Sequence, residues 1–309
     1  MAPLPTGRSG FSRGDGEAMS TGPSRDAWDS PTDRPIGVFD SGFGGLSILR
    51  EIRRYLPAED LLYFADTAHC PYGSRSREEI QRLSVGIARH LIDRGAKLIV
   101  VACNTASVAA VSRLRATYPT VPFVRVVPAV KPAAEKTRTG RVAVLATPAM
   151  FQGEMFEDLI RDFASNVEVV RQVCPGLVEL VEAGKTEGPE VETLLREYLR
   201  PAQEAGADEV VLGCTHYPFL RPAVEAIVGP GVQVIDTGAA VARQVGRVLD
   251  EKGLRRQSPD DGRCTFYTSS PDVERLIPIF ARLSGENADR VFHADPDAEG
   301  AGDAAAGGI

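Results

Sequence analysis

Two cysteines in matched settings are the residues of this chain best placed to do chemistry. Cys103 and Cys214 each follow a short apolar run that is typical of a buried parallel strand. Amide, hydroxyl and imidazole side chains come directly after the two thiols: Asn104, Thr105, Thr215 and His216. Because open α/β sheets bind ligands at the carboxyl ends of their strands, two facing edges would place a thiol on each side of one small molecule. That geometry suits removal of a proton from one face of a carbon atom and delivery of a proton to the other face.

Each thiol has a candidate partner of a different kind. Asp40 ends the first predicted strand, at the same sheet edge as Cys103, and His216 lies two residues after Cys214. A thiol acts as a base only when its neighbours lower its pKa or take its proton. A carboxylate or an imidazole within hydrogen-bond reach can do this. A single buried cysteine after an apolar run is usually part of the core, so the argument depends on the matched pair.

Strands and helices alternate through most of the chain. Apolar runs predict nine strands, at residues 35–40, 61–66, 97–103, 121–127, 141–147, 167–173, 209–214, 232–236 and 264–269. Runs with apolar residues at helical spacing separate most of them. This repeating order predicts an α/β fold with parallel sheets, helices on both faces and right-handed crossovers.

The two halves of the chain share a weak internal repeat. GVFDSG is similar in pattern to AVLATP, and VVACNT to VLGCTH, with a period near 105 residues. We therefore expect two similar doubly wound domains with parallel-sheet cores and the active site in the cleft between them. The first would comprise residues 34–132 plus 237–294, and the second residues 133–236. Residues 1–33 and 295–309, rich in small and polar residues, are predicted to be disordered tails.

Composition narrows the class of protein. The net charge of −7 and the isoelectric point near 5.3 argue against a general nucleic-acid binder. Five cysteines, an odd number partly in strand-like runs, favour free thiols in a reducing compartment. No apolar run approaches the roughly 18 residues of a membrane span, and the N-terminus lacks a signal-peptide core. We expect a cytoplasmic protein that binds neither nucleic acid nor membrane. Trp28 falls in the predicted tail, where no core is expected for it.

Two loops carry weaker signals. The segment DSGFGG at 40–45 lacks the last glycine of GxGxxG, so backbone amides near a small carboxylate are favoured over a dinucleotide site. The segment CPYGSRS at 70–76 is either a plain turn or a loop that closes Tyr72 and the Gly73 amide over a ligand. We interpret Cys70 in this loop as incidental.

Metal and cofactor sites receive little support. Cys103, Cys214 and His216 are possible zinc ligands, but the chain has no CxxC or HxxxH spacing. Pyridoxal phosphate would need a Schiff-base lysine and a phosphate cup, and neither Lys97 nor Lys131 has a persuasive context. We expect no metal and no cofactor.

Five segments together resemble bacterial glutamate racemases, which belong to the wider aspartate/glutamate racemase superfamily. In chain order they are DSGFGG at 40–45, CPYGSRS at 70–76, ACNTAS at 102–107, CPGLVELVE at 174–182 and GCTHYPFLRP at 213–222. The resemblance spans about residues 35 to 250. Members acting on aspartate tend to have Glu after the second Cys-Thr, where this chain has His216, and this favours glutamate.

The resemblance implies a cofactor-independent proton transfer at the α-carbon of glutamate, with D-glutamate supplied for peptidoglycan synthesis. Cys103 would act on the D-isomer and Cys214 on the L-isomer. Asp40 would assist Cys103, and His216, supported by Glu182, would assist Cys214. Substrate contacts would come from eight residues: Asp40, Ser41, Tyr72, Gly73, Asn104, Thr105, Thr215 and His216. A homodimer is also expected, since relatives form dimers.

One segment departs from the family pattern. Many relatives carry TxxTxxS after the strand at 141–147, whereas this chain has Thr147, Met150 and Gly153, so a hydroxyl that often binds the substrate carboxylate is missing. Three alternatives remain open: a relative acting on aspartate or a hydantoin, a binding protein without catalysis, and a metal hydrolase. The complete set of thiols and partners argues against a scaffold without activity.

Overall fold

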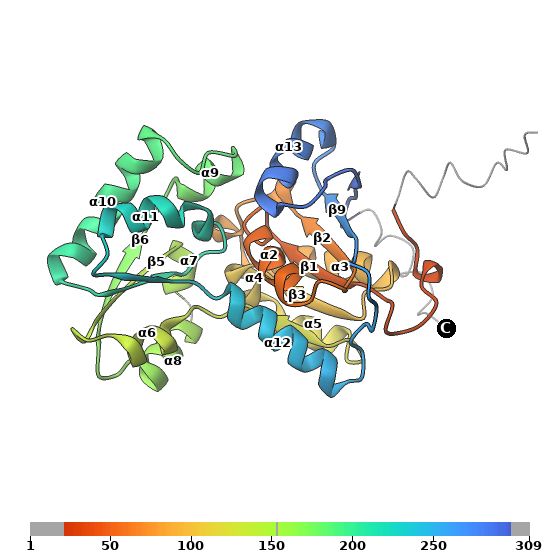
Figure 1. Ribbon diagram of the computed structural model, residues 1–309, viewed down its shortest axis with the longest axis horizontal. Coiled ribbons are helices and arrows are strands. Elements are labelled where there is room, and N and C mark those ends of the chain that lie inside the picture. The colour runs from red at the N-terminus through yellow and green to blue at the C-terminus, as the bar shows by residue number, and fades with distance from the viewer. Residues whose placement is uncertain (1–21, 153, 298–309) are drawn as a thin grey trace, which may run out of the picture.

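The computed structural model describes residues 22–152 and 154–297 and contains two parallel sheets side by side (Figure 1). The larger sheet has six strands in the order β10-β9-β2-β1-β3-β4. Its strands are β1 (Ile36–Asp40), β2 (Leu61–Ala65), β3 (Leu98–Val101), β4 (Phe123–Arg125), β9 (Cys264–Thr268) and β10 (Val291–His293). The smaller sheet has the order β6-β5-β7-β8, with β5 (Arg141–Ala146), β6 (Glu168–Val173), β7 (Glu209–Leu212) and β8 (Gln233–Ile235).

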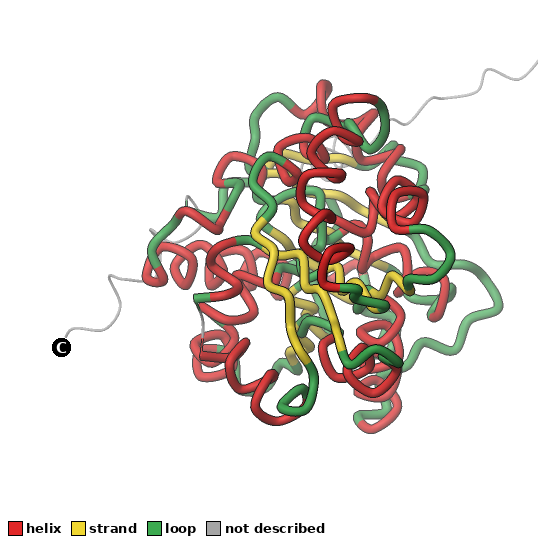
Figure 2. Tube along the Cα trace, turned by 90° about the vertical axis from the view of Figure 1, so that its left-hand side faces the viewer, coloured by secondary structure: helices red, strands yellow, loops and turns green. Residues whose placement is uncertain are grey.

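Helices cover both faces of each sheet, as the view toward the smaller sheet makes clear (Figure 2). Those beside the larger sheet are α2 (Leu46–Tyr55), α3 (Arg77–Asp93), α4 (Asn104–Ala109), α5 (Val111–Thr117), α12 (Gly238–Glu251) and α13 (Val273–Ser284). Those beside the smaller sheet are α6 (Val130–Lys136), α7 (Pro148–Phe151), α8 (Glu154–Phe163), α9 (Leu177–Glu182), α10 (Pro189–Ala205) and α11 (Arg221–Val228). Short 3₁₀ turns are η1 (Arg25–Ala27), η2 (Thr67–His69), η3 (Tyr72–Ser74) and η4 (Tyr217–Leu220).

The predicted repeat is confirmed by strand order. The order β2-β1-β3-β4 in the larger sheet is the same, strand for strand, as β6-β5-β7-β8 in the smaller one, and every pairing is parallel. The α/β class with two similar doubly wound units is therefore correct. The residue boundaries proposed for the domains stay a prediction.

Burial on both faces explains why the strands are continuous apolar runs. In β1, all five residues are buried. Ile36 and Val38 pack into one apolar cluster with α2 and α12, whereas Phe39 points into the other cluster with α3. Successive side chains of a strand point to opposite faces, so a strand covered by helices on both sides must be apolar throughout. Such a strand presents its polar residues only at its ends.

Three local details differ from the sequence-based expectations. Trp28, in the predicted tail, is partly buried and its indole Nε1 donates a hydrogen bond to the Arg94 carbonyl at 3.0 Å, although it joins none of the apolar clusters of the described residues. The helix expected after Cys103 is broken at Ala110 into α4 and α5. A tenth strand, β10, forms where no strand was predicted. The remaining parts of the two predicted tails, residues 1–21 and 298–309, lie outside the described residues.

Within residues 22–152 and 154–297, no helix combines the length and apolar character needed to cross a bilayer.

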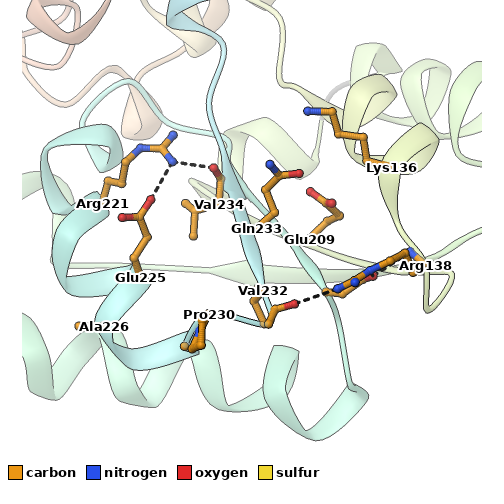
Figure 3. Close-up of a pocket in the computed structure, with 13 residues that line it drawn as sticks. Lys136, Arg138, Glu209, Arg221, Glu225, Ala226, Pro230, Val232, Gln233 and Val234 are labelled. Carbon is orange, nitrogen blue, oxygen red and sulfur yellow. Dashed lines mark hydrogen bonds and ion pairs between the residues drawn. The ribbon is translucent and has the colours of Figure 1, made fainter.

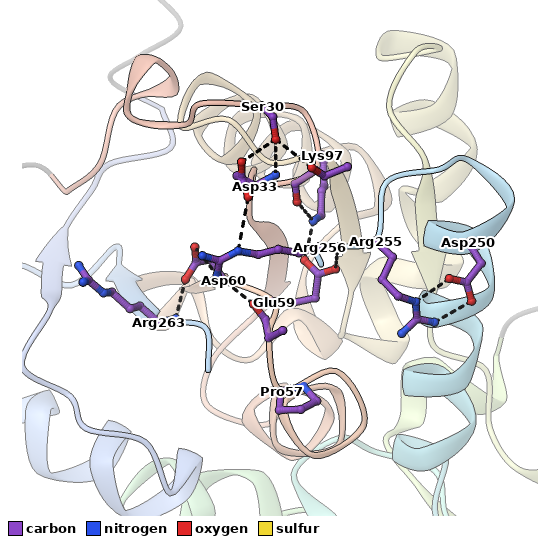
Figure 4. A network of polar contacts seen from close by, with 12 residues as sticks. Ser30, Asp33, Pro57, Glu59, Asp60, Lys97, Asp250, Arg255, Arg256 and Arg263 are labelled. Carbon is purple, nitrogen blue, oxygen red and sulfur yellow. Dashed lines mark hydrogen bonds and ion pairs between the residues drawn. The ribbon is translucent and has the colours of Figure 1, made fainter. Parts of the chain in front are cut away.

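A buried ionic network lies where residues 30–34 meet the amino ends of β2 and β3 (Figure 4). Lys97 donates to Glu59 Oε2 at 2.5 Å and to the Thr32 carbonyl at 2.6 Å. The other oxygen of Glu59 accepts the backbone N–H of Arg256 at 2.9 Å. The side chains of Lys97 and Glu59 are only 2% and 1% exposed. Each charge therefore depends on its partner, because water cannot replace either one.

Removing one member of this pair should destabilise the fold. We expect Lys97→Met to lower the free energy of unfolding by about 3–5 kcal/mol, since it leaves an uncompensated buried carboxylate. Urea denaturation measures this change. Lys131→Met is the matched control, because Lys131 forms an exposed pair with Glu135 and should lose less than about 1 kcal/mol. Equal losses of unfolding free energy in Lys97→Met and Lys131→Met would contradict the conclusion that the buried Glu59 carboxylate depends on Lys97.

Candidate active site

Cys103 lies where β3 passes into α4. Its sulfur accepts the backbone N–H of Ala106 at 3.5 Å and donates to Ser41 Oγ at 3.8 Å. The Ser41 hydroxyl in turn donates to Asp40 Oδ1 at 3.4 Å. Asp40 ends β1, the strand next to β3, so the predicted meeting of Asp40 and Cys103 at one sheet edge is confirmed.

Cys214 occupies the equivalent position after β7 in the smaller sheet. Its sulfur lies 3.6 Å from His216 Nδ1, and His216 Nε2 lies 2.6 Å from Glu182 Oε1. Glu182 is the last residue of α9. The same carboxylate oxygen also accepts the backbone N–H of Phe43, at 2.6 Å, from the loop after β1. Glu182 therefore connects the two halves of the molecule directly behind the Cys214–His216 pair.

The two thiols line one small cavity of about 30 Å³ between the carboxyl ends of the two sheets. Most of the predicted substrate contacts also line it: Ser41, Tyr72, Gly73, Asn104, Thr105, Thr215 and His216. The rest of the lining comes from residues outside the predicted set, Pro71, Thr147, Val178 and Gly213. Asp40 and Glu182 lie behind this lining. Asn104 Oδ1 is buried and has no hydrogen-bond partner among the described residues. An unpaired buried acceptor is costly unless a ligand satisfies it.

The loop between β2 and α3 brings Tyr72 and Gly73 to the cavity. Asp66 is fully buried and accepts the Tyr72 hydroxyl at 2.5 Å on one oxygen, while His69 Nδ1 lies 2.7 Å from the other. These two contacts hold the loop against the end of β2. Asp66 has no role in the sequence-based hypothesis.

Glycines after Asp40 make room for side chains of the other half. A Cβ atom added at Gly42 would lie 2.3 Å from Glu182 Oε1, and one at Gly44 would lie 2.3 Å from His216 Nδ1. Real Cβ contacts are never this short, so any side chain there would displace the Glu182–His216 pair. The glycines of the 40–45 loop thus permit close packing against this pair. Backbone amides of the loop serve Asp40 and Glu182, because Gly45 N donates to Asp40 Oδ2 at 2.6 Å.

The pKa values of Cys103, Asp40 and His216 are all raised, but for different physical reasons. Desolvation raises the pKa of Cys103 well above its ordinary value, and the nearby charge of Asp40 raises it further. Burial likewise raises the pKa of Asp40, although His216 and Cys103 oppose this. Burial alone would lower the pKa of His216, but hydrogen bonds to Cys214, Cys70 and Glu182 raise it well above the usual range. His216 Nδ1 lies within hydrogen-bond reach of the Cys214 sulfur, so the two groups can exchange a proton.

Cys70 lies beside the cavity, whereas Met150 lies away from it. Cys70, interpreted as incidental, contacts His216 across the cleft. Nothing in the local sequence around Cys70 signals this, since the contact depends on how the two halves face each other. Met150 is buried in the apolar cluster on the α6–α8 face of the smaller sheet rather than in the cavity. Thr147 lines the cavity, and Gly153 lies outside the described residues.

A much larger hollow, of about 1050 Å³, lies at the opposite ends of β7 and β8 (Figure 3). Charged side chains of both signs line it, and Arg221 there donates to Glu225 and to the Val234 carbonyl. None of the predicted site residues reaches it. Volume alone therefore does not identify the functional site, whereas the placement of thiols and their partners does.

Comparisons with known proteins identify the family of this chain. The sequence model of the family described as Asp/Glu/Hydantoin racemase matches residues 36–245. A glutamate racemase of Roseiflexus sp. is 50% identical over 250 residues, which cover 81% of this chain and 92% of that protein. One of Pseudomonas aeruginosa strain PAO1 is 51% identical over 246 residues, covering 79% of this chain and 92% of that protein.

Solved structures are similar as well. The Francisella tularensis glutamate racemase in complex with D-glutamate has 30% identity and a TM-score of 0.75, covering 86% of this chain and 99% of that chain. The Escherichia coli enzyme, in complex with L-glutamate and the activator UDP-MurNAc-Ala, has 33% identity and a TM-score of 0.75, with 85% and 98% covered. Sequence and fold agree, and the chain belongs to the Asp/Glu/hydantoin racemase family, among its glutamate racemases.

Proposed function

We propose that this protein interconverts L-glutamate and D-glutamate without a cofactor, using Cys103 and Cys214 as the two groups that exchange protons with the α-carbon. One observation carries the proposal: both thiols line the same small cavity, and each has its own proton-handling partner. The identity of the relatives supports glutamate as the substrate.

In the direction from L-glutamate to D-glutamate, Cys214 with His216 acts as the base and Cys103 with Asp40 acts as the acid. The charged His216 stabilises a thiolate at Cys214, which takes the α-proton of L-glutamate and becomes a thiol. Cys103, kept as a thiol by burial and by Asp40, gives its proton to the opposite face of the resulting carbanion. The step leaves a thiol at Cys214 and a thiolate at Cys103. The enzyme returns to its starting form when Cys214 releases a proton to solvent and Cys103 takes one from solvent, relayed by the protonated form of Asp40 and by Ser41. The reverse direction starts from a thiolate at Cys103.

The carbanion needs stabilisation, because the α-proton of an amino acid is only weakly acidic. Fixed polar groups are most effective where water is excluded. Asn104 Oδ1, an unsatisfied acceptor, is placed to accept a hydrogen bond from the substrate ammonium group. Hydroxyl groups of Ser41, Thr105 and Thr215 and the Gly73 amide surround the remaining space and are suited to the carboxylates.

The closed cavity implies movement during each turnover. A volume of about 30 Å³ holds on the order of one water molecule and is too small for glutamate. The two halves must therefore part to admit the substrate. Closure then brings Glu182 onto Phe43 N and His216, so completion of the site is coupled to exclusion of water.

Three further parts of the hypothesis go with this activity. D-glutamate made by this reaction would supply peptidoglycan synthesis. A cytoplasmic location and a homodimer stay predictions. The alternative substrates, aspartate and a hydantoin, are tested together with glutamate in the experiment that follows.

The first test is exchange of the α-hydrogen of glutamate for deuterium, followed by proton NMR in D₂O. After dialysis against a chelator and with no added cofactor, the wild type should exchange and invert both isomers. Cys103→Ala and Cys214→Ala should each slow inversion by about 10²-fold or more, since each removes one acid–base group.

Cys264→Ala is the matched control, because Cys264 is a buried thiol in β9 outside the cavity lining. This variant should retain inversion. Inversion that persists in Cys103→Ala or Cys214→Ala would refute the two-thiol mechanism. Exchange of aspartate or a hydantoin, without exchange of glutamate, would show that the substrate is not glutamate.

The pH profile tests the role assigned to Glu182. Glu182→Gln removes a carboxylate whose hydrogen bond raises the pKa of His216, so this pKa should fall. The protonated imidazole is then lost at lower pH. We expect the alkaline limb of kcat/KM for L-glutamate to move to lower pH, as measured by circular dichroism of the amino acid.

Glu179→Gln provides a comparison on the same helix, since Glu179 is exposed and one turn away from Glu182. Its profile should match that of the wild type. An unchanged alkaline limb in Glu182→Gln would show that this carboxylate does not control the imidazole.

A further inference from the structure

Three side chains from separate segments place potential metal ligands together beside the cavity. The Cys70 sulfur, a Glu182 oxygen and a His216 nitrogen all lie within 4.8 Å of one another. Cys70 precedes η3 on the side of the larger sheet, whereas Glu182 and His216 belong to the smaller-sheet half. The cluster therefore spans the two halves of the molecule.

The donor set suits zinc. Thiolate, imidazole and carboxylate are the three ligand types that Zn²⁺ binds, at about 2.0–2.3 Å, with tetrahedral geometry. Such bond lengths put ligand atoms roughly 3.3–3.8 Å apart. The His216 Nε2–Glu182 Oε1 pair, now 2.6 Å apart, would therefore open slightly to admit the ion, and the Cys70 sulfur would move toward it. The side chains have room for this movement, because Cys70 is only partly buried and the Glu182 side chain is 18% exposed. Their exposure also gives an ion a path from solvent.

We propose that this chain binds one zinc-class divalent cation through Cys70, Glu182 and His216, and that the bound ion inhibits the racemase reaction. The imidazole would bind the ion through Nε2, the nitrogen that faces Glu182, and the fourth position would hold water. Binding releases the thiol proton of Cys70 and any proton on the imidazole, because only the deprotonated groups are ligands.

Two consequences make the ion an inhibitor rather than a catalyst. It would occupy the imidazole and the carboxylate that the proposed reaction needs beside Cys214. It would also connect the two halves of the molecule and hold the cavity closed, so that substrate cannot enter. The inhibition rests on the proposed function, whereas the binding itself does not.

Direct binding is measured on the reduced full chain by calorimetric titration with zinc chloride and by the thiolate-to-metal absorption of Co²⁺. The wild type should bind one ion per chain, and zinc should raise its melting temperature. Cys70→Ser should weaken binding at least about tenfold and abolish the cobalt–thiolate band, because it removes one of three ligands.

Cys174→Ser is the matched control, since Cys174 is a buried thiol close to Cys214 but outside the cluster. Its zinc affinity should equal that of the wild type. Equal affinities for Cys70→Ser and the wild type, an equal loss in Cys174→Ser, or no binding to the wild type would each overturn the proposal.

Kinetics separate this proposal from the proposed function. Zinc should inhibit inversion of glutamate, EDTA should reverse the inhibition, and Cys70→Ser should need at least about tenfold more zinc, each protein being compared with its own rate without metal. Racemisation without zinc binding overturns the metal site alone. Zinc binding that depends on Cys70 without racemisation overturns the proposed function and leaves the metal site standing.

Discussion

One carboxylate oxygen contacts both halves of this protein at the site. Glu182 Oε1 accepts one hydrogen bond from the Phe43 amide in the larger-sheet half and lies 2.6 Å from the His216 imidazole in the smaller-sheet half. Much of the surrounding structure follows from this contact. The loop after β1 needs glycine at 42 and 44 because Glu182 and His216 occupy the space that side chains would take. The raised pKa of His216 has the same origin, because Glu182 is among its hydrogen-bond partners.

The two cysteines are equivalent by topology and different by chemistry. Both follow the third strand of a four-strand unit with the same order, so the repeat places each thiol at the carboxyl end of its own sheet. The packing of the two halves then brings both thiols to one cavity. Their neighbours break the symmetry, because Cys103 lies near the buried carboxyl of Asp40 and Cys214 lies beside an imidazole. A reaction that removes a proton on one side and adds one on the other needs one base and one acid at the outset. Different partners on a duplicated scaffold supply this asymmetry.

Much of the fold could be predicted because parallel strands buried on both faces are continuous apolar runs that end in polar residues. This property locates β1, β3, β5 and β7, and through them Asp40, Cys103 and Cys214. Features that depend on the packing of distant segments could not be predicted. Cys70 meets His216 only because the loop after β2 crosses the cleft, and Trp28 is held by a carbonyl at the end of α3. The short strand β10 has too few apolar residues to be recognised.

The order of the strands along the chain also bears on how the protein is made. The smaller sheet is built from residues 141–235, whereas the larger sheet takes its last two strands from residues 264–293. During synthesis, β2 therefore has an unpaired apolar edge until β9 has left the ribosome, and such edges are prone to pair with other chains. The smaller sheet has no such delay, because all four of its strands emerge together. A nascent chain from which β8 has emerged and β9 has not would thus carry one complete sheet and one sheet with an exposed strand edge, which is prone to aggregate.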